Sequence, residues 1–567
     1  MSLIGALNVG KTALAVQQAA LQVTGNNIAN TGNADYTRQT ARIVPGADQQ
    51  IRPGMFVGTG INLTAIERQI DEALEQRLRG SMSDAEGADV VQQWLGWVES
   101  VFNELSDEDL STQLSTFFNS WSNLANKPQD IGLRQVVLQN GSSVAKGLGS
   151  LRNGLGELQK DVDSRLAALA GTADTLAGQI ADLNQQIVVA EGGSGGLANG
   201  LRDQRDAVLK RLSQLMDINV VDTGDGMVNV NVGSEPLVAG VINRGVGIRQ
   251  ETTEDGALIT AVIIKADNGA MKLTAGQLGA LTSVRLRLDE AIADVDALAG
   301  NLIFELNKLH SAGQGLVGMT QITGASVVRD PTVALNDQDT GLAAPPANGS
   351  FVIHVKQKLT GLVSSTLIKV DLDGLNGNDT TLNSLIAELD AVDGISASLV
   401  GGKLRIDSDS TDSEISFSQD SSGVLASLGV NAFFTGKDAR DLAISAALKA
   451  DPRLLAAARN GQPADNQTAI AIAALESTAL TGLSGATLKE KYQVIVNGVA
   501  VDAQTARTNA EAARVVKDTL QAQREALSGV SMDEEAINLM RQQRAFQAAS
   551  RLIAAVDEMM QTVLSMV

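Results

Sequence analysis

The chain has 567 residues, a formal net charge of −21 and a composition that is 44% hydrophobic and 19% charged, so it is typical of a globular protein and excludes global disorder. At ~150 residues per domain the length predicts three or four domains, and the negative charge argues against a nucleic-acid or anionic-membrane binder, since both need a basic surface. The absence of cysteine excludes disulfides, thiolate metal sites and a cysteine nucleophile.

Residues 1–30 predict a helix, because Leu7, Leu14, Leu21 and Ile28 follow one another at seven-residue spacing. Its end carries a group of asparagines in "GNNIANTGNADYTRQ", and Gly32 supplies a helix stop. The segment lacks a basic start followed by an unbroken apolar run. It is therefore not an ordinary cleavable secretory signal, and no run approaches the ~20 apolar residues of a membrane span. By default these observations predict a cytoplasmic protein.

The middle of the chain alternates between helical and strand-like patterns. Helical periodicity dominates from about residue 70 to 216, period-two alternation with Asp-Gly and Asn-Gly turns follows, and a helix resumes before His310. After it comes a Gly-, Ser-, Thr- and Asp-rich stretch with short strands and one helix, which predicts an α+β insertion. Helix is expected again from about Asp438.

The last stretch is the most regular part of the sequence. Ser531 followed by Glu534 predicts a capped start, and a helix of ~35 residues would be about 50 Å long. Its apolar positions repeat at seven residues or fill the alternate seam: Leu539, Phe546, Ile553, Val556, Met560 and Val563. A lone helix in water is only marginally stable. The stripe therefore needs a partner, and the comparable stripe lies at the other end of the chain.

The sequence thus predicts a multidomain α+β protein whose N- and C-terminal helices pair as a coiled coil, with a helical-bundle inner domain and β-rich outer domains looped out from the middle of the chain. The predicted domains are residues 1–35 with 530–567 (terminal coiled coil), 36–216 with 274–312 and 438–529 (helical inner domain), 217–273 (β-rich hairpins) and 313–437 (outer insertion).

No group of residues predicts catalysis. His310 and His354 are the only histidines and sit in no metal-binding motif. "DLDGLNGND" (371–379) resembles a calcium loop, but Leu375 and Leu382 stand where EF-hand ligands are required, so a capped turn is the better interpretation. We therefore predict no enzyme activity, no cofactor and no metal.

Both ends of the chain resemble the bacterial flagellar axial proteins, which include the rod, hook and hook-associated proteins. "SLIGALNVGKTALAVQQAALQVTGNNIANTGNADYTRQ" is similar to their N-terminal signature, and "SGVSMDEEAINLMRQQRAFQAASRLIAAVDEMMQTVLSMV" to the C-terminal one. "YTRQ", "FVGTGINLTAIERQIDEALEQRLR", "SGVSMDEE" and "PADNQTAIAIAAL" look like the hook-associated branch. "TGNADY" departs from the more usual Asn-Thr-Pro-Gly-Tyr-like turn, and the insertion is variable in the family.

The resemblance implies a structural subunit at the junction of hook and filament, outside the cell, after a transient cytoplasmic stage. It implies export through the flagellar type III apparatus by an uncleaved signal and a cytoplasmic chaperone on the C-terminal helix. The implied neighbours are like subunits, the hook protein and the second hook-associated junction protein. The alternatives are another axial subunit (hook protein or second junction protein), a secreted enzyme or glycan-binding protein acting through 313–437, and a coiled-coil signalling protein.

Within that interpretation we predict an assembly interface at the two ends of the chain. Leu7, Leu14, Leu21 and Ile28 would form the seam between the terminal helices. Asn26, Asn27 and Asn30 would hydrogen-bond neighbouring backbone and fix the register, as a buried asparagine does in coiled coils. The alternative is that these asparagines only cap the end of the helix.

Overall fold

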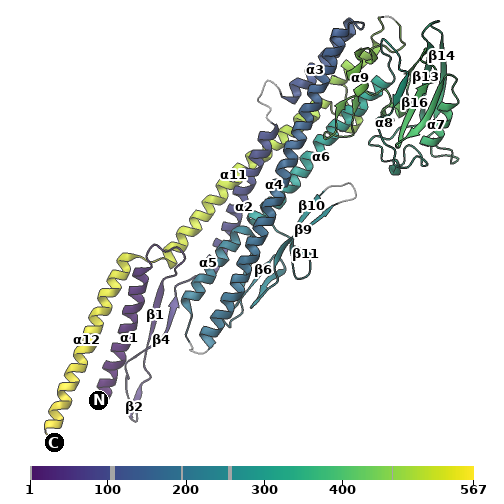
Figure 1. Cartoon of the computed structure of the whole chain (residues 1–567). Coiled ribbons are helices and arrows are strands. Elements are labelled where there is room, and N and C mark those ends of the chain that lie inside the picture. The colour runs from purple at the N-terminus through teal and green to yellow at the C-terminus, as the bar shows by residue number, and fades with distance from the viewer. Residues whose placement is uncertain (1–2, 103–108, 193–195, 253–257, 463, 567) are drawn as a thin grey trace. The chain divides into compact units, whose positions relative to one another are not determined.

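The computed structural model describes every residue except 1–2, 103–108, 193–195, 253–257, 463 and 567. The chain, drawn in Figure 1, divides into two compact units. Unit 1 comprises Met1–Trp94, Asp161–Arg285 and Gln504–Val567, and unit 2 comprises Leu95–Lys160 and Leu286–Ala503. The protein is therefore multidomain, with helices and small sheets and with a long helix at each end, as the sequence predicts.

Unit 1 contains the helices at both ends of the chain, α1 (Leu3–Ala29) and α12 (Met532–Ser565), together with α5 (Asn199–Leu215). Longer helices contribute residues to both units: α2 (Glu72–Phe102), α4 (Ile131–Gly192), α6 (Gly276–Ser311) and α11 (Leu488–Ser528). Their lengths agree with the helical periodicity of the sequence in these regions.

The strands of unit 1 form small antiparallel sheets. Next to α1, β1 (Gln39–Pro45) pairs with β4 (Ile61–Arg68), and the segment between them folds into the hairpin of β2 (Gln49–Arg52) and β3 (Met55–Val57). Two further sheets follow α5: β5 (Asn219–Asp222), β6 (Val228–Val232), β7 (Glu235–Ala239) and β8 (Ile242–Asn243) in one, and β9 (Val246–Thr252), β10 (Leu258–Ile264) and β11 (Gly269–Ala270) in the other. Alternating valines on β6 bury one face, which is the expected pattern for a half-buried strand.

The last helix begins where the sequence predicts a cap. The Ser531 side chain accepts a hydrogen bond from the Glu534 N–H, and Asp533, Glu534 and Glu535 occupy the first turn, where the helix dipole favours negative charge. A short break at Gly529 separates α12 from α11. The prediction of a capped final helix of ~35 residues is confirmed.

An aromatic cluster organises the helical part of unit 2. Phe117 and Trp121 come from α3 (Leu110–Asn126), and Phe433 and Phe434 come from the last residues of the insertion. The ring centroids of Phe433 and Phe434 lie 4.8 Å apart in an edge-to-face arrangement. Only 3% of the residues are aromatic, so this cluster concentrates much of the aromatic surface at the point where the chain returns from the insertion.

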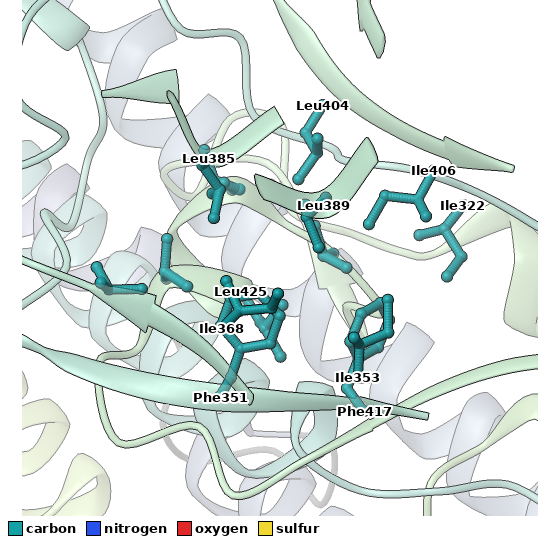
Figure 2. Close-up of a cluster of buried hydrophobic side chains, with 14 of the residues drawn as sticks. Ile322, Phe351, Ile353, Ile368, Leu385, Leu389, Leu404, Ile406, Phe417 and Leu425 are labelled. Atoms are coloured by element: carbon teal, nitrogen blue, oxygen red, sulfur yellow. The ribbon is translucent and has the colours of Figure 1, made fainter. Parts of the chain in front are cut away.

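The insertion has a core of its own, shown in Figure 2. One sheet joins β13 (Gly349–Gln357) to β14 (Val363–Val370) and β17 (Ser413–Ser418), and the other joins β16 (Lys403–Ser408) to β12 (Gln321–Thr323) and β15 (Ile395–Val400). Leu385 and Leu389 of α7 (Leu382–Asp390) and Leu425 of α8 (Val424–Leu428) are buried with Phe351, Ile353 and Phe417 of the strands.

From the end of the insertion to α11 the chain is less helical than the sequence suggests. The regular elements there are short: β18 (Phe434–Thr435), β19 (Ala443–Ile444), α9 (Ala446–Ala450), α10 (Gln467–Ala474) and the 3₁₀ turns η2 (Pro452–Leu454), η3 (Leu475–Ser477) and η4 (Thr481–Leu483), with η1 (Gln338–Thr340) inside the insertion. Pro452 lacks the N–H that a continuous helix requires. Its neighbours bond instead to other loops, for example Leu316 N–H to Arg453 O.

Candidate assembly site at the two ends of the chain

The two terminal helices lie side by side and run in opposite directions (Figure 1). Thr24 Oγ1 donates to Gln542 Oε1 over 2.9 Å, whereas nearer the start of the chain Gly10 packs against Ile553. A Cβ atom placed on Gly10 would lie 2.7 Å from Ile553 Cγ1. A glycine at this position therefore allows the two helices to approach closely.

Four of the six buried residues of α1 follow a 4-3-4 spacing, which is that of a helix seam: Val16, Ala20, Val23 and Asn27, with Gly10 and Thr24 as the other two. Those of α12 are Glu535, Ala549 and Val556. The sequence pattern placed the seam on neighbouring positions of α1, and these are half-buried: Leu7, Leu14, Leu21 and Ile28. On α12, Leu539, Phe546, Ile553 and Met560 are half-buried and Val563 is exposed.

Near the C-terminal end of α1, the carboxamide of Asn27 uses all of its hydrogen-bonding capacity. Its Nδ2 donates to Gln39 O over 2.9 Å and to Glu535 Oε2 over 3.1 Å. Its Oδ1 accepts from the Tyr36 hydroxyl over 2.7 Å and from the Gln39 N–H over 3.1 Å. The side chain is 1% exposed. One carboxamide thus connects the end of α1, the turn after it, the first residue of β1 and the start of α12.

The Tyr36 hydroxyl is held neutral in this surrounding. The pKa of Tyr36 is raised to about 12, first by burial and then by the carboxylates of Asp203 and Glu535, since each opposes a second negative charge. A neutral hydroxyl is what the hydrogen bond requires, because it donates to Asn27 Oδ1.

Arg38 also binds Glu535 and therefore joins the contacts around Asn27. Its guanidinium lies 2.7 Å from Glu535 Oε1 and 2.8 Å from Glu534 Oε2, and its backbone N–H donates to Ser528 O at the end of α11. The Glu535 side chain is 3% exposed, whereas that of Glu534 is 61% exposed. Buried Glu535 therefore receives hydrogen bonds from both Asn27 and Arg38, which offsets the cost of burying its charge.

Two further arginines, Arg524 and Arg68, form ion pairs that hold the segments around this junction. Arg524 of α11 donates to Glu75 Oε1 over 3.1 Å and to Ala34 O over 2.9 Å. Arg68 of β4 contacts Asp203 and Asp206 of α5, at 2.9 and 2.6 Å. The start of α2, the turn after α1 and the end of α11 are thereby held together.

The asparagine group predicted from the sequence therefore divides into different roles. Asn27 is buried in the junction, whereas Asn26 is exposed and Asn30 is half-buried and donates to Asn26 O. The partners Tyr36, Arg38 and Glu535 lie within the quoted signatures, but the sequence contains no signal that they meet. Only the fold places Glu535 beside a residue 508 positions away.

The groups considered for other chemistry lie in ordinary structural positions. His310 lies in the last turn of α6 and is buried, with Nδ1 bonded to Asn431 O and Nε2 accepting from Ala456 N–H. Among the described residues, one group of acidic side chains is close enough to share a metal ion, formed by Asp371, Asp373 and Asp379. These carboxylates accept bonds from their own turn, including one from Asn378. Within the described part of the chain no helix is long and apolar enough to cross a membrane.

Comparisons with known proteins agree with the resemblance of the two ends. Residues 95–325 match the family model of the flagellar hook-associated protein FlgK helical domain, and residues 521–566 match that of the flagellar basal body rod FlgEFG protein C-terminal. Flagellar hook-associated protein 1 of Salmonella typhimurium is 23% identical over 99% of both chains, and that of Escherichia coli is 24% identical over 97% of both.

Two other relatives extend the comparison. Flagellar hook-associated protein 1 of Bacillus subtilis is 32% identical over 38% of this chain and 43% of its own length. The structure of the flagellar hook junction protein FlgK from Burkholderia pseudomallei matches 80% of this chain and all of its own, with a TM-score of 0.53 and 15% identity, which shows a shared fold. The matches all point to a structural protein family of the flagellum. The chain is thus similar along its whole length to flagellar hook-associated protein 1, and the resemblance to the flagellar axial family seen at its two ends is confirmed.

Proposed function

We propose that this chain is a structural subunit of the bacterial flagellum that joins the hook to the filament. The observation that carries the proposal is the convergence of the two terminal segments on Asn27, which bonds Glu535. Both segments resemble axial-protein signatures, and here they form one folded junction. Full-length similarity to flagellar hook-associated protein 1 supports the same function. The protein then acts through the surfaces it presents to its neighbours.

In this proposal residues 1–35 with 530–567 form a coiled coil that lies innermost in the assembly. The helical domain (36–216, 274–312 and 438–529), the hairpin region (217–273) and the insertion (313–437) lie progressively outwards. The antiparallel packing of α1 on α12 and the seam spacing of Val16, Ala20 and Val23 support the coiled coil.

The assembly interface consists of apolar positions that the pair α1–α12 leaves partly open. Leu7, Leu14 and Leu21 are half-buried on α1, and Val563 is 50% exposed on α12. Copies stacked through different surfaces of the same chain make heterologous contacts, which build an open helical layer. The neighbours are like subunits, the hook protein below and the second hook-associated junction protein above.

The route to this location begins in the cytoplasm. The chain passes through the flagellar type III export apparatus, with a chaperone bound to the C-terminal helix beforehand. A further row of apolar side chains on α12 and directly after it supports this step: Ile537, Met540, Leu552, Met559 and Met566 are all at least 41% exposed. Covering such a row before export prevents association in the wrong place.

Deleting the gene in the source bacterium tests the proposed function. Electron microscopy of the cells is expected to show completed hooks without filaments, and flagellin is expected in the medium. Restoring the full-length gene is the control and should restore filaments. Missing hooks would assign the chain to the hook itself, and intact filaments would refute the proposal.

A further inference from the structure

The β2–β3 hairpin of unit 1 has a stiff tip and little contact with its own chain. All its residues except the last are exposed, including Ile51, Met55 and Phe56, and Phe56 is 61% exposed. The tip is Arg52-Pro53-Gly54-Met55, with φ of 80° at Gly54, which is the conformation that a type II turn requires of its third residue. An isolated two-stranded hairpin is only marginally stable in water. These features indicate a segment that is covered in the assembled state.

Unit 1 also contains a polar cleft of about 870 Å³ beside the Asn27 junction. The end of α1 and the turn after it form one wall, and α4 and α5 form the other. Eight of the lining residues carry carboxamide side chains, among them Asn26, Asn30, Gln186 and Asn199. Among the described residues, none that lines this cleft belongs to the β2–β3 hairpin.

The chemistry of the cleft fits a loop of polypeptide. A carboxamide both donates and accepts, so it matches the N–H and C=O groups that a turn leaves unpaired. Asn199 is 7% exposed and donates to Ile66 O, but its Oδ1 has no hydrogen-bond partner. This buried acceptor calls for a donor from outside the chain. Leu183 and Leu197 provide apolar surface in the same cleft.

The charges of the cleft and the hairpin are opposite. Asp35 and Asp182 are exposed in the cleft and take part in no ion pair among the described residues, and Arg211 is the cation there. Arg52 is the one basic residue of the hairpin strands, and within the described chain it has no carboxylate partner. A guanidinium at the tip of an incoming loop would meet two carboxylates that form no ion pair in the described chain.

We propose that the β2–β3 hairpin of one copy inserts into this polar cleft, beside the Asn27 junction, of a second copy. Arg52 then faces Asp35 and Asp182, the main chain of the tip bonds to the carboxamides, and Ile51 or Met55 covers Leu183 and Leu197. Hairpin and cleft are different surfaces of one chain, so the contact is heterologous and repeats without closing a dimer. The inference rests on the proposed function, since it names one contact between like subunits in the assembled layer.

Cysteine cross-linking in assembled flagella tests the contact, because the chain has no cysteine of its own. Full-length chains carrying Met55→Cys with Gln186→Cys, or Met55→Cys with Leu197→Cys, are introduced into the deletion strain. Isolated flagella are treated with a short bismaleimide. We expect a ladder of covalently linked copies from at least one double variant and only monomer from each single variant. Normal filaments without a ladder from either double variant would overturn the inference while leaving the proposed function intact.

A charge exchange provides an independent readout. Arg52→Glu is expected to lower the amount of this chain per flagellum severalfold, and Asp182→Arg in the same chain is expected to restore it. Arg165→Glu is the matched control, since Arg165 is exposed on α4 outside the cleft. Equal incorporation of Arg52→Glu and Arg165→Glu would overturn the contact. Failure of the unaltered chain to restore filaments would instead refute the proposed function.

Discussion

The Nδ2 atom of Asn27 lies 3.1 Å from Oε2 of Glu535, and the two residues are 508 positions apart. One belongs to the asparagine group that ends the first helix and the other to the acidic first turn of the last helix. Both side chains are nearly inaccessible to solvent. We therefore expect their contact to fix the register of α1 against α12, because sliding either helix would break a hydrogen bond between a buried amide and a buried carboxylate.

Replacing Asn27 tests that role. Asn27→Ala removes the partner of Tyr36, Gln39 and Glu535 inside a buried site, so we expect the terminal helices to lose about 2–4 kcal/mol of local stability. Amide hydrogen exchange along α1 and α12 measures this loss. Asn26→Ala is the control, since Asn26 is exposed and bonds only to Asn30 through its side chain. Equal exchange rates in the two variants would show that Asn27 sets no register.

Two adjacent glutamates give a matched comparison of buried and exposed charge. Glu535→Ala removes one of the two acceptors of Asn27 Nδ2 and leaves Arg38 without its buried partner, and we expect a loss of about 3 kcal/mol. Glu534→Ala removes an ion pair whose carboxylate is mostly in water, and the expected loss is below about 1 kcal/mol. Thermal unfolding of the full chain compares the two. Similar losses would mean that the buried contact contributes no more than the surface pair.

Close approach of the two helices depends on Gly10. Gly10→Ala places a methyl group 2.7 Å from Ile553 Cγ1, so we expect overpacking to cost about 1–3 kcal/mol. The second substitution Ile553→Ala should recover part of that loss by removing the clashing atom. Gly25→Ala on the same helix meets nothing within 4 Å and is expected to be neutral or stabilising by up to about 1 kcal/mol. Hydrogen exchange of α12 provides the measurement, and a harmless Gly10→Ala would contradict the packing.

The sequence predicted the elements of this site better than their contacts. The heptad spacing and the Ser531 cap placed both terminal helices, because each depends on residues close in sequence. The most buried apolar positions of α1 are Val16, Ala20 and Val23 and not the leucines, because α12 and the β1–β4 sheet both pack on α1 and share its apolar surface. The hydrogen-bond network of Tyr36, Arg38 and Glu535 around Asn27 could not be predicted from the sequence, since a hydrogen bond between residues 508 positions apart leaves no periodic pattern.

Tyr36 predicts a change of stability at high pH. Its pKa is about 12 in the fold and ordinarily about 10, so the folded chain keeps a proton that the unfolded chain loses between these values. The contribution of Tyr36 to stability is therefore constant below about pH 10 and is lost as the pH rises towards 12. Tyr36→Phe should weaken this dependence and also lower stability at neutral pH by about 1 kcal/mol, because Asn27 Oδ1 loses a donor. Urea unfolding at a series of alkaline pH values measures both effects. An unchanged slope in the variant would contradict the assignment.

The burial of His310 predicts a loss of stability at low pH, whereas that of Tyr36 predicts a loss at high pH. Burial lowers its pKa from 6.5 to about 4, and nearby Arg134 acts in the same direction. Both ring nitrogens are already used, one donating to Asn431 O and the other accepting from Ala456 N–H, so a second proton would break the latter bond. The unfolded chain binds a proton below about pH 6.5 and the folded chain does so only near pH 4. Stability is therefore complete above about 6.5 and declines as the pH falls towards 4, by up to about 3 kcal/mol.

The substitution His310→Gln removes the titrating group and should flatten this decline, although the loss of a buried partner lowers stability at neutral pH as well. The control is His354→Gln, which changes the other histidine on β13 and leaves the His310 component in place. Urea unfolding followed by tryptophan fluorescence reports the transition, because Trp121 lies against the His310 ring. If His310→Gln kept the full slope between about pH 4 and 6.5, carboxylates elsewhere in the chain would have to account for the acid sensitivity.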